Sequence, residues 1–486
     1  MNSGDRIIYR GLNTDGGPYM YRKALPFAAA LAIILAAAAI AQEEVAPGDM
    51  FLKAERFKLR SDDAYKIVVT EVFKGDIGER EVYNSPGPVR AGTVIEDVMG
   101  HKFDAPKVDS WVYFVDDVPG ADWGHPAKLV YADAMKGAPS VIDCHFPPKM
   151  LPAFGGITKG AAEEIGRIKD YEWWKEIKVP ALEKYPFKEP SKNKKYHVLI
   201  SGGVNAWMNN PRYLNDLKFI YYTLQKRFDG NGDDNVYVIY ADGVSVDLDG
   251  DGDNDVDYAA TEANVVGVLT TLAGKLGKDD ILFVYVNNHG GYESGKDCYI
   301  CLYYAEQITD DRFAALINKI QAGQMKFVFK QCYSGGMVDD LAALSGRNLV
   351  VATASKYDES AYGAESPPGF GADGYGEFTY WWTAAVYEGY PPTVFPGTHP
   401  TSPDPKTADV NNDNKVSMKE AFDFAKKYDR RPEHPQYYAS PAAANEWTLC
   451  TKPCGCGEAS AAEAAAFFGF FAACYGTILL RRKFKS

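Results

Sequence analysis

Short apolar runs alternate with helical patterns in the second half of the chain. The runs begin near Tyr196, Asn235, Ile281, Lys326 and Asn348. They are rich in the β-branched and aromatic residues that are typical of buried strands. Over 309–320, apolar residues recur three and four positions apart, and Thr309 supplies an N-cap before Asp310 and Asp311. This alternation predicts a mostly parallel sheet with helices on both faces, which is an α/β fold.

Residues 43–150 instead predict a small β-rich domain. Runs of β-branched and aromatic residues at 65–73, 110–115 and 128–132 are bounded by turn residues, which favours a small barrel or sandwich. We find no catalytic constellation in this part of the sequence, so we expect the domain to bind a partner or to cover the α/β domain. Residues 151–195 are predicted to form a helical linker that ends in a Lys/Pro-rich joint.

Two of the predicted strands end in residues with reactive side chains. The run 281–286 is followed by Asn-Asn-His289-Gly290, and the run 326–329 is followed by Lys-Gln-Cys332 in a loop of small residues. In a parallel sheet both loops emerge at the same carboxyl edge, where open α/β sheets place their sites. A thiol and an imidazole brought together there provide a nucleophile and a general acid/base. The pattern therefore predicts a cysteine peptidase.

The order and spacing of these motifs resemble the legumain (asparaginyl endopeptidase) family of caspase-fold cysteine peptidases. Two further stretches agree, since 198–207 resembles the family's first strand and 351–363 resembles the strand and loop beside its specificity pocket. The resemblance covers about residues 195–390. It implies a caspase-like peptidase domain over residues 196–400, endopeptidase activity, and peptide or protein substrates.

The resemblance also assigns roles to four residues. Cys332 would attack the scissile carbonyl to form an acyl-enzyme, and His289 would protonate the leaving amine. The backbone N–H groups of Gly290 and Cys332 would form the oxyanion hole. Asn205 would hold the imidazole ring in its orientation.

The residues expected to bind substrate leave the specificity open. They are Tyr333, Ser355, Asp358, Glu359 and Glu377. Legumains have an acidic residue directly after the catalytic cysteine, where this chain has Tyr333, and an aspartate before the histidine, where this chain has Asn288. An asparagine at the P1 position, whose carbonyl is attacked, therefore remains one alternative. A basic P1 residue that faces Glu377, Asp358 or Glu359 is the other.

A calcium loop is predicted after the peptidase domain, within residues 401–430. Residues 409–420 follow the EF-hand pattern and run into a predicted helix. The expected ligands are side-chain oxygens and, at the seventh position, a carbonyl: Asp409, Asn411, Asp413, Lys415, Ser417 and Glu420. Asn414 replaces the usual glycine at the sixth position, and asparagine tolerates the left-handed turn needed there.

A second acidic loop lies between the second and third predicted strands of the peptidase domain. Its carboxylates stand at alternate positions, at Asp247, Asp249, Asp251, Asp253 and Asp255. So many like charges repel one another without a cation, which favours calcium, and a solvated acidic loop is the alternative. The loop also resembles the nucleophile motif of aspartate-dependent phosphohydrolases, but the other strand ends lack that family's residues. Nothing in the sequence predicts an organic cofactor.

Charge and the two ends of the sequence bear on location. The net charge of −13 argues against nucleic-acid binding, which needs a basic face. Residues 1–41 resemble a secretory signal peptide, with an uncleaved membrane anchor as the alternative. Residues 450–486 hold Cys-Gly-Cys, an apolar stretch and a basic end, which resemble a bacterial sorting tail, with a plain tail anchor as the alternative. We expect an exported protein at the cell surface or in the periplasm, attached to the membrane or cell envelope through this tail.

Two alternatives to a hydrolytic peptidase remain at this stage. A non-catalytic, calcium-dependent surface binding module could use the same fold. A transpeptidase would pass the acyl group to an amine instead of water, and the sequence does not separate the two reactions.

The remaining cysteines include a close pair. Cys298 and Cys301 form a Cys-x-x-Cys motif. An exported location allows this pair to be a disulfide, a metal pair or two buried thiols.

Overall fold

The computed structural model describes residues 50–162, 195–227, 235–364, 374–392, 395 and 399–449. These residues all belong to one compact unit that spans 47–486. The predicted signal peptide, most of the predicted helical linker and the predicted sorting tail lie outside the described residues. Within the described part of the chain, no helix combines the length and apolar character needed to cross a membrane.

A six-stranded sheet forms the centre of the α/β domain. Its order is β16-β15-β14-β10-β8-β9, and all neighbours are parallel except β15 and β16. The strands are β8 (Lys195–Ser201), β9 (Val236–Tyr240), β10 (Ile281–Asn287), β14 (Gln324–Lys330), β15 (Leu349–Thr353) and β16 (Gln436–Ser440). The predicted α/β fold with a mostly parallel sheet is confirmed. Because β16 belongs to this sheet, the domain continues past residue 400, where the sequence placed its end.

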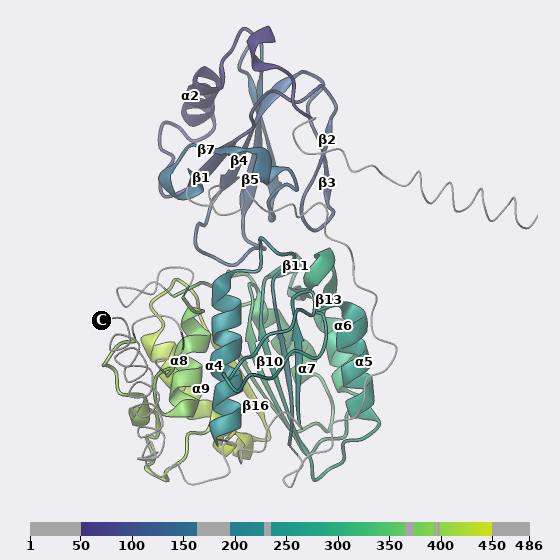
Figure 1. Cartoon of the computed structure of the whole chain (residues 1–486), viewed down its shortest axis with the longest axis vertical. Coiled ribbons are helices and arrows are strands. Elements are labelled where there is room, and N and C mark those ends of the chain that lie inside the picture. The colour runs from purple at the N-terminus through teal and green to yellow at the C-terminus, as the bar shows by residue number, and fades with distance from the viewer. Residues whose placement is uncertain are drawn as a thin grey trace, which may run out of the picture. The chain divides into compact units, whose positions relative to one another are not determined.

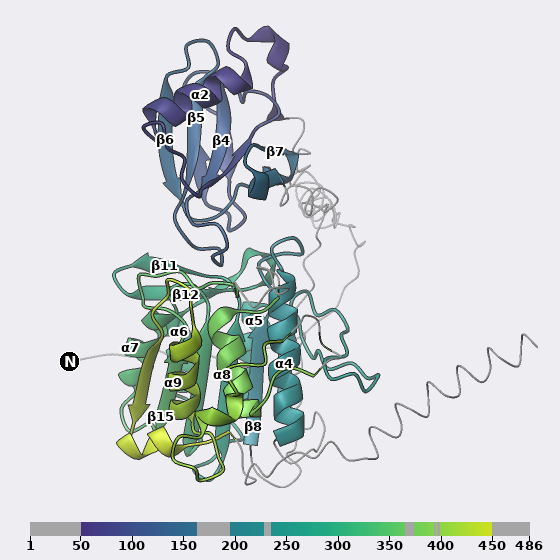
Figure 2. The ribbon, with the colours of Figure 1, turned by 90° about the vertical axis from the view of Figure 1, so that its left-hand side faces the viewer.

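Helices cover both faces of the central sheet (Figures 1 and 2). One face carries α4 (Pro211–Arg227), α8 (Glu377–Tyr387) and α9 (Met418–Tyr428). The other carries α5 (Glu262–Ala273), α6 (Asp310–Ile317) and α7 (Met337–Ala342). The Thr309 hydroxyl accepts a hydrogen bond from the Arg312 N–H, so the predicted N-cap of α6 is confirmed.

A small antiparallel sheet follows the central strand β10. It consists of β11 (Gly290–Ser294), β12 (Asp297–Cys301) and β13 (Gln307–Thr309). Cys298 and Cys301 lie on β12 as buried free thiols, the third of the three alternatives. Short 3-10 helices occur at Ala54–Arg56, Leu151–Ala153, Tyr303–Ala305, Ser334–Gly336, Pro405–Ala408 and Ala442–Glu446.

The N-terminal part of the described chain is built on an antiparallel sheet of order β6-β5-β4-β1-β7. The strands are β1 (Glu81–Asn84), β4 (Ser110–Asp116), β5 (Ala127–Asp133), β6 (Pro139–Cys144) and β7 (Gly155–Gly156), and a separate pair is formed by β2 (Val94–Glu96) and β3 (Lys102–Asp104). The predicted runs at 110–115 and 128–132 are therefore strands. The predicted barrel or sandwich is wrong, because the five strands form an open sheet and β2 and β3 add only a two-stranded pair. Strand β7 extends the open sheet beyond residue 150.

The predicted strand at 65–73 is also wrong, because residues Ser61–Glu71 form the helix α2. The run is β-branched, which favours a strand locally. Ala64 and Val68, four positions apart, are both fully buried on one side of the helix, in a cluster with Trp111 of β4. The Trp111 indole N–H donates to the Leu59 carbonyl just before α2. Packing against the sheet therefore overrides the local preference.

His197 on β8 makes folding stability depend on pH. Its ring is buried against Phe283, and burial, with Lys195 and Lys326 nearby, lowers its pKa to about 3. Between pH 6.5 and 3, His197 binds a proton in the unfolded chain but stays neutral in the folded chain. The folding stability is therefore lost as the pH falls through this window.

We expect His197→Phe to flatten the acid limb of stability by up to about 1.4 kcal/mol per pH unit. Urea unfolding from pH 7 to pH 4 measures the slope. His434→Phe, at a largely exposed ring, is the matched control. An unchanged slope in His197→Phe would show that this ring is not the group that titrates.

Candidate active site

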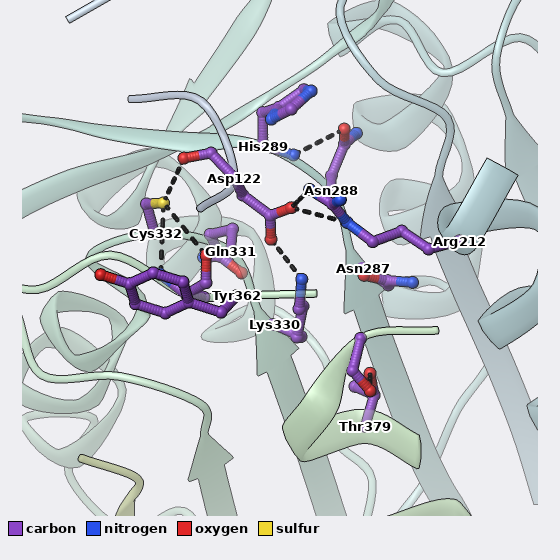
Figure 3. A network of polar contacts seen from close by, with 12 residues as sticks. Asp122, Arg212, Asn287, Asn288, His289, Lys330, Gln331, Cys332, Tyr362 and Thr379 are labelled. Atoms are coloured by element: carbon purple, nitrogen blue, oxygen red, sulfur yellow. Dashed lines mark hydrogen bonds and ion pairs between the residues drawn. The ribbon is translucent and has the colours of Figure 1, made fainter. Parts of the chain in front are cut away.

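His289 and Cys332 follow neighbouring strands of the central sheet. Strands β10 and β14 are parallel and pair along their whole length, up to Asn287 opposite Lys330. His289 lies two residues after the end of β10 and Cys332 two residues after the end of β14, and both side chains are buried. The parallel register therefore brings the two loops to the same carboxyl edge, as the sequence predicts (Figure 3).

Close backbone contacts fix the loop that carries Cys332. Tyr333 adopts a left-handed φ of 61° and its N–H donates to the Glu359 carbonyl. A side chain at Gly336 would meet the Lys296 carbonyl oxygen at 2.3 Å. A bulkier residue at this position would therefore force the loop away from the β11–β12 turn, and with it the cysteine.

The imidazole of His289 is oriented by a backbone carbonyl. Its Nε2 lies 2.9 Å from the Met208 oxygen, and its Nδ1 accepts a hydrogen bond from the Trp123 N–H. Since Nδ1 is an acceptor, the ring proton lies on Nε2 and is donated to Met208. Asn205 acts on this turn, because its side-chain oxygen accepts a hydrogen bond of 3.0 Å from the Met208 N–H. Asn205 therefore orders the carbonyl that holds the ring.

A loop between β4 and β5 of the N-terminal sheet enters this centre. The main-chain oxygen of Asp122 lies 2.8 Å from the Cys332 sulfur. The next N–H, that of Trp123, donates to His289 Nδ1 over 2.7 Å. The Gly290 N–H donates to the Trp123 carbonyl over 3.4 Å. One peptide bond of the chain thus contacts both the thiol and the imidazole.

The carboxylate of Asp122 occupies a pocket of cations (Figure 3). It accepts a hydrogen bond of 3.1 Å from Arg212 Nε and one of 2.8 Å from the Tyr213 hydroxyl, and it forms an ion pair with Lys330. The side chains of Asp122 and Lys330 have no exposed surface. Burial by itself would raise the pKa of Asp122, but the charges of Lys330 and Arg212 outweigh it and hold the pKa below its ordinary value.

The acidic residues predicted to bind substrate do not line this pocket. Glu377 is buried at the start of α8 and accepts a hydrogen bond from the Trp381 indole. Asp358 is exposed, and Glu359 pairs with Lys356 and His434. The pocket beside the thiol is cationic, so it gives no support to a basic P1 residue.

The other two predicted substrate-binding residues support the cysteine loop. The Ser355 hydroxyl lies 3.1 Å from that of Ser334 and is fully buried. The Tyr333 ring packs on Tyr292 with 4.9 Å between ring centres. Ser355 and Tyr333 thus lie close to Cys332. Among the described residues, neither forms a hydrogen bond with the Asp122 carboxylate.

Both reactive groups are held in their neutral forms. Burial lowers the pKa of His289 to about 3, although the nearby Asp122 acts in the opposite direction. Burial also raises the pKa of the Cys332 thiol above its ordinary value, and the Asp122 charge adds to this. With the loop in place, the centre is therefore a thiol beside a neutral imidazole, which is the resting form of a nucleophile and base.

The EF-hand-like loop has the turns that its sequence predicts. Asn414 adopts a left-handed φ of 62°. The Asp409 carboxylate accepts hydrogen bonds from the N–H groups of Asp413 and Asn414, so it turns into the loop. Glu420 forms a capping box with Ser417 at the start of α9. Among the described residues, the carboxylates of Asp409, Asp413 and Glu420 do not form a cluster within 4.8 Å.

In the second acidic loop, three of the predicted ligands converge. Carboxylate oxygens of Asp247, Asp249 and Asp255 lie within 4.8 Å of one another. Asp255 is buried and accepts hydrogen bonds from the Leu248 N–H and the Tyr221 hydroxyl. Asp251 and Asp253 lie outside this cluster and are exposed.

Sequence reasoning missed Asp122, Arg212 and Lys330. Lys330 offers a signal, because a lysine that ends an apolar strand two positions before the cysteine must be buried or paired. Arg212 lies at the start of a helical pattern, where a charged residue is common, so it gives no comparable signal. Asp122 lies in a loop of a different sheet, and no periodicity brings it to this edge.

The six-stranded, mostly parallel sheet with helices on both faces is a caspase-like α/β fold. Residues 195–373 match the model of the Peptidase C13 family. This segment of the chain is similar to that family, the legumain-type cysteine peptidases.

A curated relative agrees with the family. The vacuolar-processing enzyme of Citrus sinensis is 26% identical over 264 residues, which are 45% of this chain and 49% of that protein. The chain thus spans about half the length of the curated relative it matches. Among solved structures, a protein of Geobacter sulfurreducens is 15% identical, with 54% of this chain and 98% of that chain covered and a TM-score of 0.35. That likeness is too weak to add to the assignment.

Proposed function

We propose that the chain is an endopeptidase in which Cys332 is the nucleophile and His289 the general acid/base. The observation that supports this role is the placement of the Asp122–Trp123 peptide bond. Its carbonyl oxygen lies 2.8 Å from Cys332 Sγ, and its nitrogen lies 2.7 Å from His289 Nδ1. A nucleophile must reach the carbonyl carbon, which is bonded to this oxygen, and a proton donor must reach the nitrogen to cleave a peptide bond.

The chemistry follows from these positions. His289 takes the thiol proton, and the sulfur attacks the carbonyl carbon to give a tetrahedral oxyanion. The Gly290 N–H, which donates to the Trp123 carbonyl in this structure, is the donor proposed to stabilise the oxyanion. His289 then protonates the leaving amine, and water hydrolyses the thioester. Met208 and Asn205 keep Nδ1 directed toward the substrate throughout.

The test is cleavage of a diverse peptide library by the full chain, with Cys332→Ala as the inactive variant. Cys298→Ala is a matched control, because this second thiol is also fully buried. We expect the wild type and Cys298→Ala to cleave, and a thiol-directed probe to label Cys332. Products joined to an added amine would identify a transpeptidase. A folded chain with neither cleavage nor labelling would identify the non-catalytic binding module instead.

We also propose that the protein is exported and attached through residues 450–486. The support is the sequence pattern of the two ends. Fractionation of cells that express the full chain, compared with a chain truncated after Leu449, is the test. We expect only the full chain to remain with the membrane or envelope, and equal release of both chains would overturn the attachment.

We propose calcium as a structural ligand of both acidic loops. The donors are the hard oxygen ligands that calcium prefers, and three carboxylates of the second loop already converge. Millimolar calcium is expected to raise the melting temperature by about 5 °C. Asp409→Asn and Asp247→Asn should each remove part of this shift, whereas Asp423→Asn, at an exposed acid paired with Lys419, should not. An equal shift in all four chains would contradict binding at these loops.

A further inference from the structure

The segment around Asp122 pairs with the catalytic domain through an isolated antiparallel bridge. The Asp122 N–H donates to the Ala361 carbonyl over 2.7 Å, and the Gly363 N–H donates to the Gly120 carbonyl over 3.4 Å. Between them, Ala121 and Tyr362 form an antiparallel bridge. Main-chain pairing of this kind is how an extended peptide docks on an exposed strand. Residues 120–122 therefore bind as a peptide substrate would, with Asp122 at the P1 position.

The pocket that receives the P1 side chain is selective for a carboxylate. Arg212 and Lys330 supply two positive charges and Tyr213 a hydroxyl donor, all within contact of the Asp122 oxygens. A buried pair of cations is costly without an anion between them. An asparagine would match only part of this donor set, because its NH₂ group faces donors with another donor.

We infer that the Asp122–Trp123 bond is the chain's own processing site, and that the pocket of Arg212, Lys330 and Tyr213 selects aspartate as the P1 residue. This inference rests on the proposed function of Cys332 and His289. It deepens that function by naming the first substrate, which is a loop of the same chain, and the class of bond cleaved, which is one that follows aspartate.

The step balances as a hydrolysis. The Cys332 sulfur forms a bond to the Asp122 carbonyl carbon, and the bond from that carbon to the Trp123 nitrogen breaks. The nitrogen leaves as an amine with the proton that His289 took from the thiol. Water then cleaves the thioester, which restores the thiol and leaves Asp122 as a new C-terminus.

The described geometry is a resting form of this substrate complex. The Gly290 N–H donates to the Trp123 carbonyl, one peptide unit beyond the bond to be cut. The Asp122 oxygen instead lies against the sulfur. A rotation of one peptide unit that brings the Asp122 oxygen to the Gly290 N–H would start the reaction. The loop therefore blocks the site until it is cut.

The cut would leave the N-terminal sheet intact. Asp122 lies in the connection between β4 and β5, which pair from Ser110 opposite Asp133 to Asp116 opposite Ala127. The two fragments would stay joined by this pairing, and only the new ends at Asp122 and Trp123 would be released. The product is thus a nicked domain beside an open active site.

The experiment follows the full chain made by cell-free translation, with intact mass and N-terminal sequencing of the fragments. We expect a fragment that begins at Trp123 in the wild type and an uncut chain in Cys332→Ala. Asp122→Ala should remain uncut. Its loop lacks the carboxylate that binds Lys330 and Arg212, so an added peptide of residues 118–125 should displace it and be cleaved. Asp122→Asn should be cut roughly tenfold or more slowly, because charge-assisted hydrogen bonds are about twice as strong as neutral ones.

Four results are informative. A first-order rate that is unchanged on dilution supports cleavage within one chain. Cleavage of added peptides after aspartate with an intact 122–123 bond would overturn the processing site. Cleavage only after other residues would overturn the aspartate pocket. Absence of all peptide cleavage and of Cys332 labelling would overturn the proposed function itself.

Discussion

Gly124→Ala is expected to tighten the binding of an Asp-containing peptide on the order of 100-fold, because overpacking of this kind costs about 2–3 kcal/mol. Gly124 has a φ of +108°, and a Cβ there would lie 1.6 Å from the Gly290 carbonyl oxygen. Relieving this clash would require the backbone of Gly124 or Gly290 to move. Either movement would release the loop that holds Asp122. Once the loop leaves the site, it no longer competes with an added peptide. The apparent affinity for the peptide therefore rises by the factor by which the docked loop had lowered it.

The measurement uses the Cys332→Ala background, in which nothing is cut, and a blocked peptide of residues 118–125. Isothermal titration gives the affinity. Gly100→Ala is the matched control, since Gly100 has a φ of +90° and a Cβ there would have only a flexible Glu96 oxygen nearby, at 3.9 Å. Equal affinities for Gly124→Ala and Gly100→Ala would mean that the loop does not close the site.

Lys330→Met is expected to lower kcat/KM for aspartate peptides roughly 100- to 4,000-fold, because removing one partner of a buried ion pair costs about 3–5 kcal/mol. The ammonium has no exposed surface and contacts the carboxylate in the pocket directly. An asparagine peptide places no full charge beside the missing cation, so its kcat/KM should fall much less. The ratio of the two peptides is therefore the quantity to compare.

The Asp122→Ala background keeps the chain's own carboxylate out of the pocket during this measurement. Lys326→Met is the matched control, because Lys326 is a second buried lysine on β14 whose Nζ bonds the Thr448 carbonyl instead. A general loss of folding would reduce both peptides together. A preserved aspartate-to-asparagine ratio in Lys330→Met would exclude this lysine from specificity.

The central sheet could be predicted because its strands are buried on both faces. Such strands are continuous apolar runs, and they need no knowledge of their partners to be recognised. The helix over 61–71 could not be predicted in the same way. Its β-branched run Ile67-Val68-Val69 favours a strand, and only the contact of Ala64 and Val68 with the N-terminal sheet makes it helical.

The candidate site likewise contains residues that the sequence predicts and residues that it does not. His289 and Cys332 follow from the sequence because the ends of adjacent parallel strands must meet at one edge. Asp122 does not, because it is about 170 residues before His289 and belongs to a sheet whose docking has no sequence signature. The charges at Arg212 and Lys330 acquire meaning only once that carboxylate is placed between them.

The course of β14 bears on how an attached enzyme would meet its substrates. The Thr448 carbonyl binds Lys326 near the amino end of this strand, and Leu449 follows directly. Cys332 lies past the carboxyl end, and the seven residues of β14 span about 23 Å between the two. A chain tethered through the residues after Leu449 would hold the amino edge of its sheet toward the surface that anchors it. Its catalytic edge would then face outward, toward proteins that arrive from the surroundings rather than toward neighbours in the same membrane.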